Sequence, residues 1–292
     1  MSPTGTRVGP MERLMPDGLS PSSIELWMQC PKRFEQEKVL GRRSPGGVDS
    51  SIGTFVHLVL ELLMERPAPE RTIDAARTIL VAEWPTFLTT DNWTTLGITE
   101  DGDDARSFKR RVWAGVRGYF EIENPTRVEV VARERYLSAV CDGVPLRGII
   151  DRLDRDVFDD VVVTDYKTGK VPIPAFAAPK YRQLNLYAAM VEQVDGVLPN
   201  EGRLLFTTYG RTLATTIDRE SVEGAVETAS KVWDELHDAE DVGVYEATPG
   251  GLCGWCPFVG ECEAGLAEVR ERRAAGKLKK HAPAWELAAA PE

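Results

Sequence analysis

Two short acidic motifs stand at the ends of neighbouring apolar runs. Gly148-Ile149-Ile150-Asp151 closes one run, and Asp165-Tyr166-Lys167 closes the next. On adjacent strands these carboxylates can converge on one divalent cation, because hard oxygen ligands suit Mg²⁺ and Mn²⁺. Asp165 and Lys167 are two residues apart, so a pleated strand points both side chains to the same face. A cation beside an ammonium group fits phosphodiester hydrolysis, in which the metal activates water and the lysine orients the nucleophile or stabilises the transition state.

Each of these candidates also has a purely structural interpretation. Taken alone, the aspartate and lysine two residues apart could form a surface ion pair on one strand. Gly53, His57 and Glu61 follow each other at spacings of four and share one helical face. His57 could complete a metal shell with Glu61 as its partner, or it could be a core or cap residue. Glu134, between two arginines, could be a further site carboxylate or a member of a cross-strand ion pair.

Three cysteines form a second candidate metal site. Cys253, Cys256 and Cys262 lie within ten residues and among several glycines that let the chain turn tightly. A fourth ligand is needed, and the other cysteines are Cys30 and Cys141. Few and unevenly spaced cysteines do not form a disulfide scaffold and are first interpreted as metal ligands. Their spacing is compatible with both zinc and an iron-sulfur cluster.

The elements that must position these residues can be predicted from periodicity. Ser20 and Pro21 are typical of a helix start, and β-branched runs separated by Asp-Gly and Asp-Asp turns predict an antiparallel meander of three strands. The succession of helices, three strands, a helix, two strands and a helix predicts an α/β fold with a mixed sheet. The predicted helices cover residues 21–30, 53–64, 70–84, 103–120, 181–194 and 218–237, and the strands cover residues 127–140, 144–155, 161–168, 204–210 and 211–217.

Two basic segments could contact nucleic acid. Arg106, Arg110, Trp113 and Arg117 make one helical stripe, on which bases could stack while arginines follow phosphates. The alternative is a solvated basic face with Trp113 in the core. Residues 270–281 are a second basic run, or only part of a flexible tail.

Composition narrows the possible classes of protein. The chain has 292 residues and a net charge of −11, so its surface as a whole is not a non-specific nucleic-acid binder. No apolar run could span a membrane and no secretory signal is visible at the amino end, which predicts a cytoplasmic protein without membrane contact. No phosphate-binding Gly-x4-Gly-Lys-Ser/Thr loop occurs, so any unwinding would come from a partner such as a helicase.

The ordered motifs resemble the RecB-type branch of the PD-(D/E)XK nuclease superfamily over about residues 19–265. They are Gly53-x3-His57, Glu134, Gly148-x2-Asp151, the run from Asp165 to Gly169, and Gln183-x3-Tyr187. The resemblance implies a restriction-endonuclease-like mixed central sheet flanked by helices. It also implies that His57, Asp151 and Asp165 hold the catalytic Mg²⁺ or Mn²⁺, that Lys167 is the catalytic lysine, and that Gln183 and Tyr187 shape the DNA-side wall.

The same resemblance bears on the cysteines. In iron-sulfur members of the family, including AddB-type and CRISPR adaptation nucleases, one amino-terminal and three carboxy-terminal cysteines hold a 4Fe-4S cluster. Cys30, Cys253, Cys256 and Cys262 match that order, which implies a staple between the two ends of the domain and leaves Cys141 as a small buried or strand residue.

These features together predict a metal-dependent DNA exonuclease acting on single-stranded ends in repair or recombination. The predicted organisation is a flexible leader over residues 1–18, a nuclease domain with an iron-sulfur cluster over 19–265, and a charged tail over 266–292. Two alternatives remain at this point. One is a catalytically silent DNA-binding or scaffold module of a helicase-nuclease assembly, and the other is a CRISPR adaptation nuclease.

Overall fold

The computed structural model describes residues 15–42, 46–88, 96–99 and 102–289. The chain divides into two compact units. One is Pro45–Thr228, and the other combines Met1–Ser44 with Ala229–Glu292. Residues 1–14 of the predicted leader and residues 290–292 of the predicted tail lie outside the described residues.

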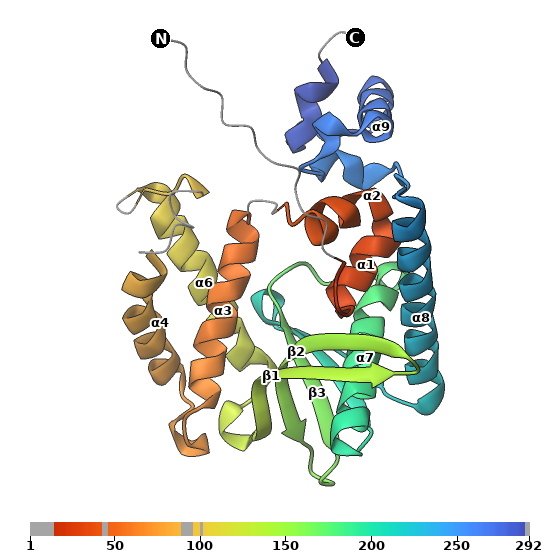
Figure 1. The fold of residues 1–292 in the computed structure, drawn as a ribbon. Coiled ribbons are helices and arrows are strands. Elements are labelled where there is room, and N and C mark those ends of the chain that lie inside the picture. Colours follow the sequence, from red (N-terminus) through yellow and green to blue (C-terminus); the bar gives the residue numbers. More distant parts are fainter. Residues whose placement is uncertain (1–14, 43–45, 89–95, 100–101, 290–292) are drawn as a thin grey trace, which may run out of the picture. The chain divides into compact units, whose positions relative to one another are not determined.

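The unit Pro45–Thr228 is built on a five-stranded sheet with the strand order β1-β2-β3-β4-β5 (Figure 1). The first three strands form the predicted antiparallel meander, β4 runs parallel to β3, and β5 returns antiparallel. A parallel pair needs a long crossover, and helix α7 provides it. The predicted α/β class and mixed sheet are therefore confirmed. The elements are β1 (Glu129–Cys141), β2 (Val144–Arg155), β3 (Val161–Lys167), α7 (Ala178–Asp195), β4 (Glu201–Phe206) and β5 (Arg211–Thr216).

The β1–β2 hairpin has a regular turn and two irregular places. Asp142 and Gly143 have φ values of 48° and 79°, so both central residues are left-handed, as a type I′ turn requires. The strand register shifts between Val130 and Ala132, which marks a bulge. Glu134 has a φ of 38° and is not paired with β2, although Arg133 and Arg135 on either side of it are paired with Arg152 and Ile150. This irregular stretch of β1 borders the acidic motif of β2.

Three helices pack together beside the sheet (Figure 1). They are α3 (Val48–Met64), α4 (Ile73–Leu88) and α6 (Asp103–Ile122). Their apolar faces share one core with Tyr166 of β3 and Leu205 of β4. Helix α3 begins before the predicted Gly53, because Asp49 in its first turn is favourable near a helix amino end. No described helix has the length and apolar character needed to cross a membrane.

The other unit begins with two helices that meet at Cys30. Helix α1 (Pro21–Gln29) starts at the predicted cap, where the Ser23 N–H donates to the Ser20 Oγ at 3.1 Å. Cys30 was expected within this first helix, but it is extended, with a φ of −169°, and separates α1 from α2 (Pro31–Phe34). The following proline disfavours helical backbone at the residue before it. Cys30 consequently stands at a corner of the chain.

The unit also contains a folded carboxy-terminal segment. Helix α8 (Arg219–Val242) begins in the sheet unit and continues into this one, and α9 (Glu263–Ala274) follows the cysteine motif. Beyond α9, short 3₁₀ turns carry a small core. That core comprises Val259, Val269, Leu278, Ala282 and Ala284. Much of the segment that the sequence predicts as a charged tail is therefore packed around a small core. Its few apolar side chains are widely spaced among charged residues, so the sequence shows no clear apolar pattern there.

Candidate functional site

Strand β3 carries the aspartate and lysine of the second acidic motif. The Lys167 Nζ lies 2.5 Å from the Asp165 Oδ2, as expected for side chains on one face of a strand. The Asp165 side chain is 4% exposed and that of Lys167 is 21% exposed. Burial raises the pKa of Asp165, and the charge of Lys167 opposes that shift. The pair is therefore a buried ion pair with its ammonium end nearer to solvent, and the alternative of a surface pair does not apply.

Asp151 of β2 is fixed to the neighbouring strand. Its Oδ2 accepts a hydrogen bond from the Tyr166 N–H of β3 at 2.7 Å. The same oxygen lies 3.5 Å from the His57 Nδ1 of α3. Burial opposes the charge of His57, but the hydrogen bond to Asp151 and its charge outweigh that effect, so the pKa of His57 is raised. The sheet and α3 thus meet at this carboxylate.

His57, Glu134 and Asp151 form a compact group of potential metal ligands. One ligand atom from each lies within 4.8 Å of the others, and all three residues are half-buried. An imidazole with two carboxylates is a donor set that Mg²⁺ and Mn²⁺ accept, so the residues fit such a metal. Asp165, which the sequence also predicts as a ligand, is not in this group, because its carboxylate binds Lys167 and Gln183. The two carboxylates are nevertheless close enough that the negative charge of Asp151 helps to raise the pKa of Asp165.

Glu134 owes its position to an unusual backbone. A non-glycine residue with positive φ is uncommon and costs energy, and such residues cluster at functional sites. Burial raises the pKa of Glu134 to about 7, with a further contribution from the negative charge of Asp151. A carboxylate held against its own preference and near another carboxylate is stabilised by a cation. This geometry favours the interpretation of Glu134 as a site residue over that of a cross-strand ion-pair member.

The two polar residues of α7 are hydrogen-bonded into the site. The Gln183 Nε2 donates to the Asp165 Oδ1 at 2.8 Å and to the Tyr187 Oη at 3.2 Å, while its Oε1 accepts from the Lys167 Nζ at 3.2 Å. Gly148 of β2 gives the Tyr187 ring its place, because a Cβ at that glycine would lie 2.8 Å from the ring. Gln183 thereby holds both members of the buried ion pair.

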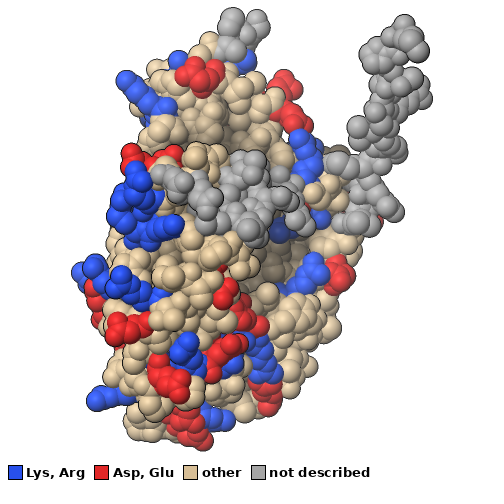
Figure 2. Space-filling view, turned by 90° about the vertical axis from the view of Figure 1, so that its left-hand side faces the viewer, with Lys and Arg blue, Asp and Glu red and all other residues tan. Residues whose placement is uncertain are grey.

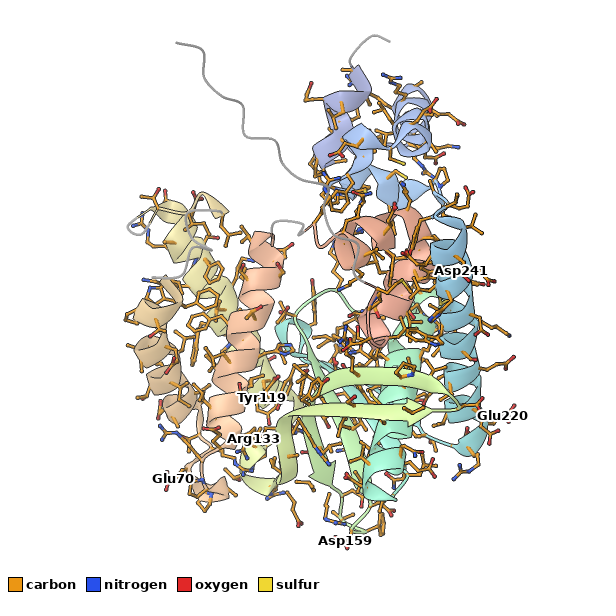
Figure 3. All side chains as sticks on the ribbon, viewed as in Figure 1. Glu70, Tyr119, Arg133, Asp159, Glu220 and Asp241 are labelled. Atoms are coloured by element: carbon orange, nitrogen blue, oxygen red, sulfur yellow. The ribbon has the colours of Figure 1, made fainter. Side chains whose placement is uncertain are left out.

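A buried polar network, which the sequence motifs did not predict, lies between the sheet and α6. Arg152 is 1% exposed, and its guanidinium binds Glu123 at 2.6 Å and Asp154 at 2.7 Å. Its Nη1 also donates to the hydroxyls of Tyr166 at 2.8 Å and Tyr119 at 3.1 Å. Figure 3 shows Tyr119 where its helix faces the sheet. Arginine and aspartate alternating within an otherwise apolar strand were the available signal. The network holds the side chain of Tyr166, which lies between Asp165 and Lys167 in β3.

The basic stripe on α6 exists, but part of its charge is balanced. Arg106, Arg110 and Arg117 are exposed, and Trp113 is half-buried against the helical core. Arg106 pairs with Asp103 at 2.5 Å, and Arg117 lies 3.9 Å from Glu121 of the same helix. Figure 2 likewise shows basic and acidic side chains interspersed over one face of the molecule.

Four cysteines line one cavity of about 500 Å³ in the unit that joins the two chain ends. They are Cys30, Cys253, Cys256 and Cys262. Backbone N–H groups point at three of the sulfurs, with N···S distances of 3.5 Å to Cys30, 3.4 Å to Cys253 and 3.3 Å to Cys262. Such groups stabilise thiolates. Cys141 is buried in the sheet unit instead, where burial raises the pKa of its thiol.

The sulfur atoms of the four cysteines are not arranged as in a compact single-ion site. In a tetrahedral zinc site with Zn–S bonds of about 2.3 Å, the sulfurs lie about 3.8 Å apart. Among the described residues, no three of the thiols have sulfur atoms that all lie within 4.8 Å of one another. The four thiols thus line one cavity without forming such a compact group.

The pKa of Glu134 leads to a testable result. Glu134→Gln is expected to raise the melting temperature of the metal-free protein at pH 8. The pKa is raised from 4.5 to about 7 in the folded chain, so ionisation of this carboxyl removes stability as the pH rises through that interval. The neutral amide has no charge to lose.

Thermal unfolding in EDTA between pH 4 and pH 8 tests this expectation. The stabilisation by Glu134→Gln should disappear below about pH 4.5, where Glu134 is protonated in both states. Glu70→Gln, at an exposed glutamate outside the site, should show no such dependence. Parallel pH profiles for wild type and Glu134→Gln would contradict the description of this carboxyl.

The family model of the PD-(D/E)XK nuclease superfamily matches residues 18–263. The crystal structure of the "Putative exonuclease" from Eubacterium rectale is similar, with 9% identity and a TM-score of 0.55 over 85% of this chain and 88% of that chain. The crystal structure of SSO0001 aligns over 86% of this chain and 88% of that chain with 12% identity, but its TM-score of 0.38 does not establish a common fold. The comparison with curated proteins found no match.

Proposed function

The chain belongs to the PD-(D/E)XK nuclease superfamily, and from that premise we propose that it is a divalent-metal-dependent exonuclease that hydrolyses DNA at single-stranded ends. The observation that carries this proposal is the convergence of His57, Glu134 and Asp151 within 4.8 Å, where Asp151 is hydrogen-bonded to the strand that bears the buried Asp165–Lys167 pair. Complete machinery of this kind argues against a catalytically silent module. The likeness to the Eubacterium rectale protein supports the fold only, because the two chains are 9% identical.

Each residue has a role that follows from its contacts. His57, Glu134 and Asp151 would hold Mg²⁺ or Mn²⁺, with Asp165 at the edge of the same site. When bound, the cation would supply Lewis-acid activation of water and neutralise charge on the phosphate. Lys167, held by Asp165 and Gln183, keeps its ammonium group directed by two partners. It can donate to the attacking water or to a phosphate oxygen as charge develops there.

In the proposed reaction, water adds to phosphorus while the bond to the leaving oxygen breaks. The proton lost by water ends on that oxygen, so the products are a phosphate monoester and a free hydroxyl. Gln183 and Tyr187 would line the wall beside the reacting phosphate. Arg110 and Arg117 on α6 would follow other phosphates of the strand, with Trp113 available to stack a base at its exposed edge.

We propose that the four cysteines hold a 4Fe-4S cluster. The shared cavity and the N–H groups aimed at the sulfurs support this assignment. The cluster would join Cys30 to the carboxy-terminal cysteines and so staple the unit. We expect the protein to act in the cytoplasm in repair or recombination, with a separate helicase supplying any unwinding.

Incubation of the purified chain with Mn²⁺ and end-labelled DNA tests the proposed activity. Single strands labelled at the 5′ or 3′ end, blunt duplexes, closed circles and an RNA of the same sequence are compared. The expected result is stepwise shortening of linear single strands from one end and no cutting of circles. Cutting of circles would show an endonuclease, preferential cutting of RNA would exclude the DNA assignment, and no cleavage of any substrate would favour the silent module.

A further inference from the structure

The basic run at residues 270–281 is not a loose tail. It contains six basic residues and one acidic residue, and it spans the end of α9 and the loop beyond it. The helix ends with Gly276 in the left-handed region at a φ of 67°. The N–H of Lys277 then donates to the Arg272 carbonyl at 2.8 Å. These contacts give the loop after α9 a defined path.

A buried leucine fixes this loop against the cysteine motif. Leu278 is 6% exposed and belongs to the small core of the unit. A Cβ at Gly254, which lies between Cys253 and Trp255 in the chain, would come within 2.8 Å of the Leu278 side chain. A larger residue at this position would force the Leu278 side chain to shift. The loop is therefore seated directly on the segment that carries two of the cysteines.

Lysines surround this anchor and face outward. Lys277, Lys279 and Lys280 are exposed, and none has an ion-pair partner among the described residues. By contrast, Arg272 pairs with Glu268 at 2.6 Å, and Arg273 lies over the Trp285 ring at 4.4 Å. Three ammonium groups without an ion-pair partner among the described residues thus occur within four residues of a chain whose net charge is −11. Self-repulsion between them favours a polyanionic ligand.

An aromatic ring lies beside the residue that follows these lysines. Trp255 is 42% exposed, and its ring centroid is 6.4 Å from that of His281, the next residue after Lys280. A partly exposed indole next to several ammonium groups is the combination that single strands use, because bases stack on the ring while phosphates bind the cations. A duplex hides its base faces and could use only the lysines.

From these contacts we infer that Trp255 with Lys277, Lys279 and Lys280 forms a second binding surface for single-stranded DNA, here named the lysine platform. It lies in the cysteine-bearing unit and contains none of the catalytic residues. The inference rests on the proposed function for the identity of the ligand. It adds a non-catalytic contact that would retain the strand between successive cleavage events.

Fluorescence anisotropy of a labelled oligothymidine tests the platform on the full chain, in EDTA so that no metal-dependent cleavage occurs. Changing the three lysines together to alanine is expected to make the slope of log affinity against log salt shallower by about 2, since each single-strand phosphate contact contributes about 0.7. Trp255→Ala is expected to weaken binding roughly tenfold or more with little change in that slope.

The matched control removes the same charge elsewhere. Lys38, Arg77 and Arg127 are exposed, and their simultaneous change to alanine should leave the slope as in wild type. An unchanged slope in the platform variant, an equal change in the control, or no oligonucleotide binding by wild type would overturn the inference. Loss of binding to phosphatidylserine vesicles without loss of oligonucleotide binding would also overturn it, in favour of a lipid surface.

These outcomes separate the inference from the proposed function. A chain that cleaves DNA but binds equally well without the platform lysines would retain the function and lose the platform. A chain that cleaves nothing but loses its salt-sensitive binding in the platform variant would retain the platform as part of a silent module.

Discussion

Asp165→Ala is expected to reduce nuclease activity below detection while the protein stays folded. The substitution removes the carboxylate that holds the Lys167 ammonium at 2.5 Å and accepts from Gln183 at 2.8 Å. The Lys167 ammonium loses this partner, which costs some stability, but it is partly exposed and keeps Gln183, so the protein is expected to stay folded. Cleavage rates with saturating Mn²⁺, together with circular dichroism and thermal unfolding, measure both parts of the expectation.

Two companion variants sharpen this test. Lys167→Ala should lower the cleavage rate by about 10²–10³, the usual cost of removing one preorganised donor to developing charge, without reducing metal affinity. Asp241→Ala, at an exposed carboxylate on α8, should cleave like wild type. Full activity of purified Asp165→Ala or Lys167→Ala would refute the assignment of the site. Weak Mn²⁺ binding by Lys167→Ala would instead give the lysine a structural role.

Cys256→Ser is expected to remove both iron and much of the stability of the protein. Wild-type protein that is purified without oxygen should be brown and contain about four iron atoms per chain, as a four-thiolate 4Fe-4S cluster requires. Without the staple, the segment around Cys30 is no longer tied to the carboxy-terminal cysteines across most of the chain. A cross-link over so long a loop contributes about 5 kcal/mol, which corresponds to a fall in melting temperature of about 10–20 °C.

Cys141→Ser is the matched control for this result. Cys141 is buried in the sheet unit and does not line the cysteine cavity, so iron content and colour should not change. Asp165→Ala should also stay brown, because its oxygen-ligand site is chemically distinct from the thiolate site. Stoichiometric zinc without iron would overturn the identity of the cluster. Colour lost in Cys141→Ser but kept in Cys30→Ser would show that the fourth ligand was wrongly assigned.

Much of the sheet unit could be predicted because its signals are local. An Asp-Gly pair between β-branched runs favours a left-handed hairpin turn, as Asp142-Gly143 forms here. The spacing of Asp165 and Lys167 places both on one face of a strand in any fold. The start of α1 followed from Ser20 and Pro21 for the same reason. By contrast, Cys30 was expected in that helix, although the proline after it disfavours helical backbone at its position.

The sequence by itself determined the fold class, the antiparallel meander of the first three strands and which residue types could serve a metal, since each depends on periodicity, turn chemistry or spacing along a few residues. Only the tertiary structure decided that Glu134 joins His57 and Asp151, that Gln183 holds both members of the buried ion pair, and that residues beyond α9 pack on the cysteine motif. Those contacts join side chains far apart in the chain, and they depend on strand register, a left-handed residue in β1 and a close approach at a glycine. No local pattern encodes such meetings, because their energy comes from burial and charge that exist only once the elements have packed.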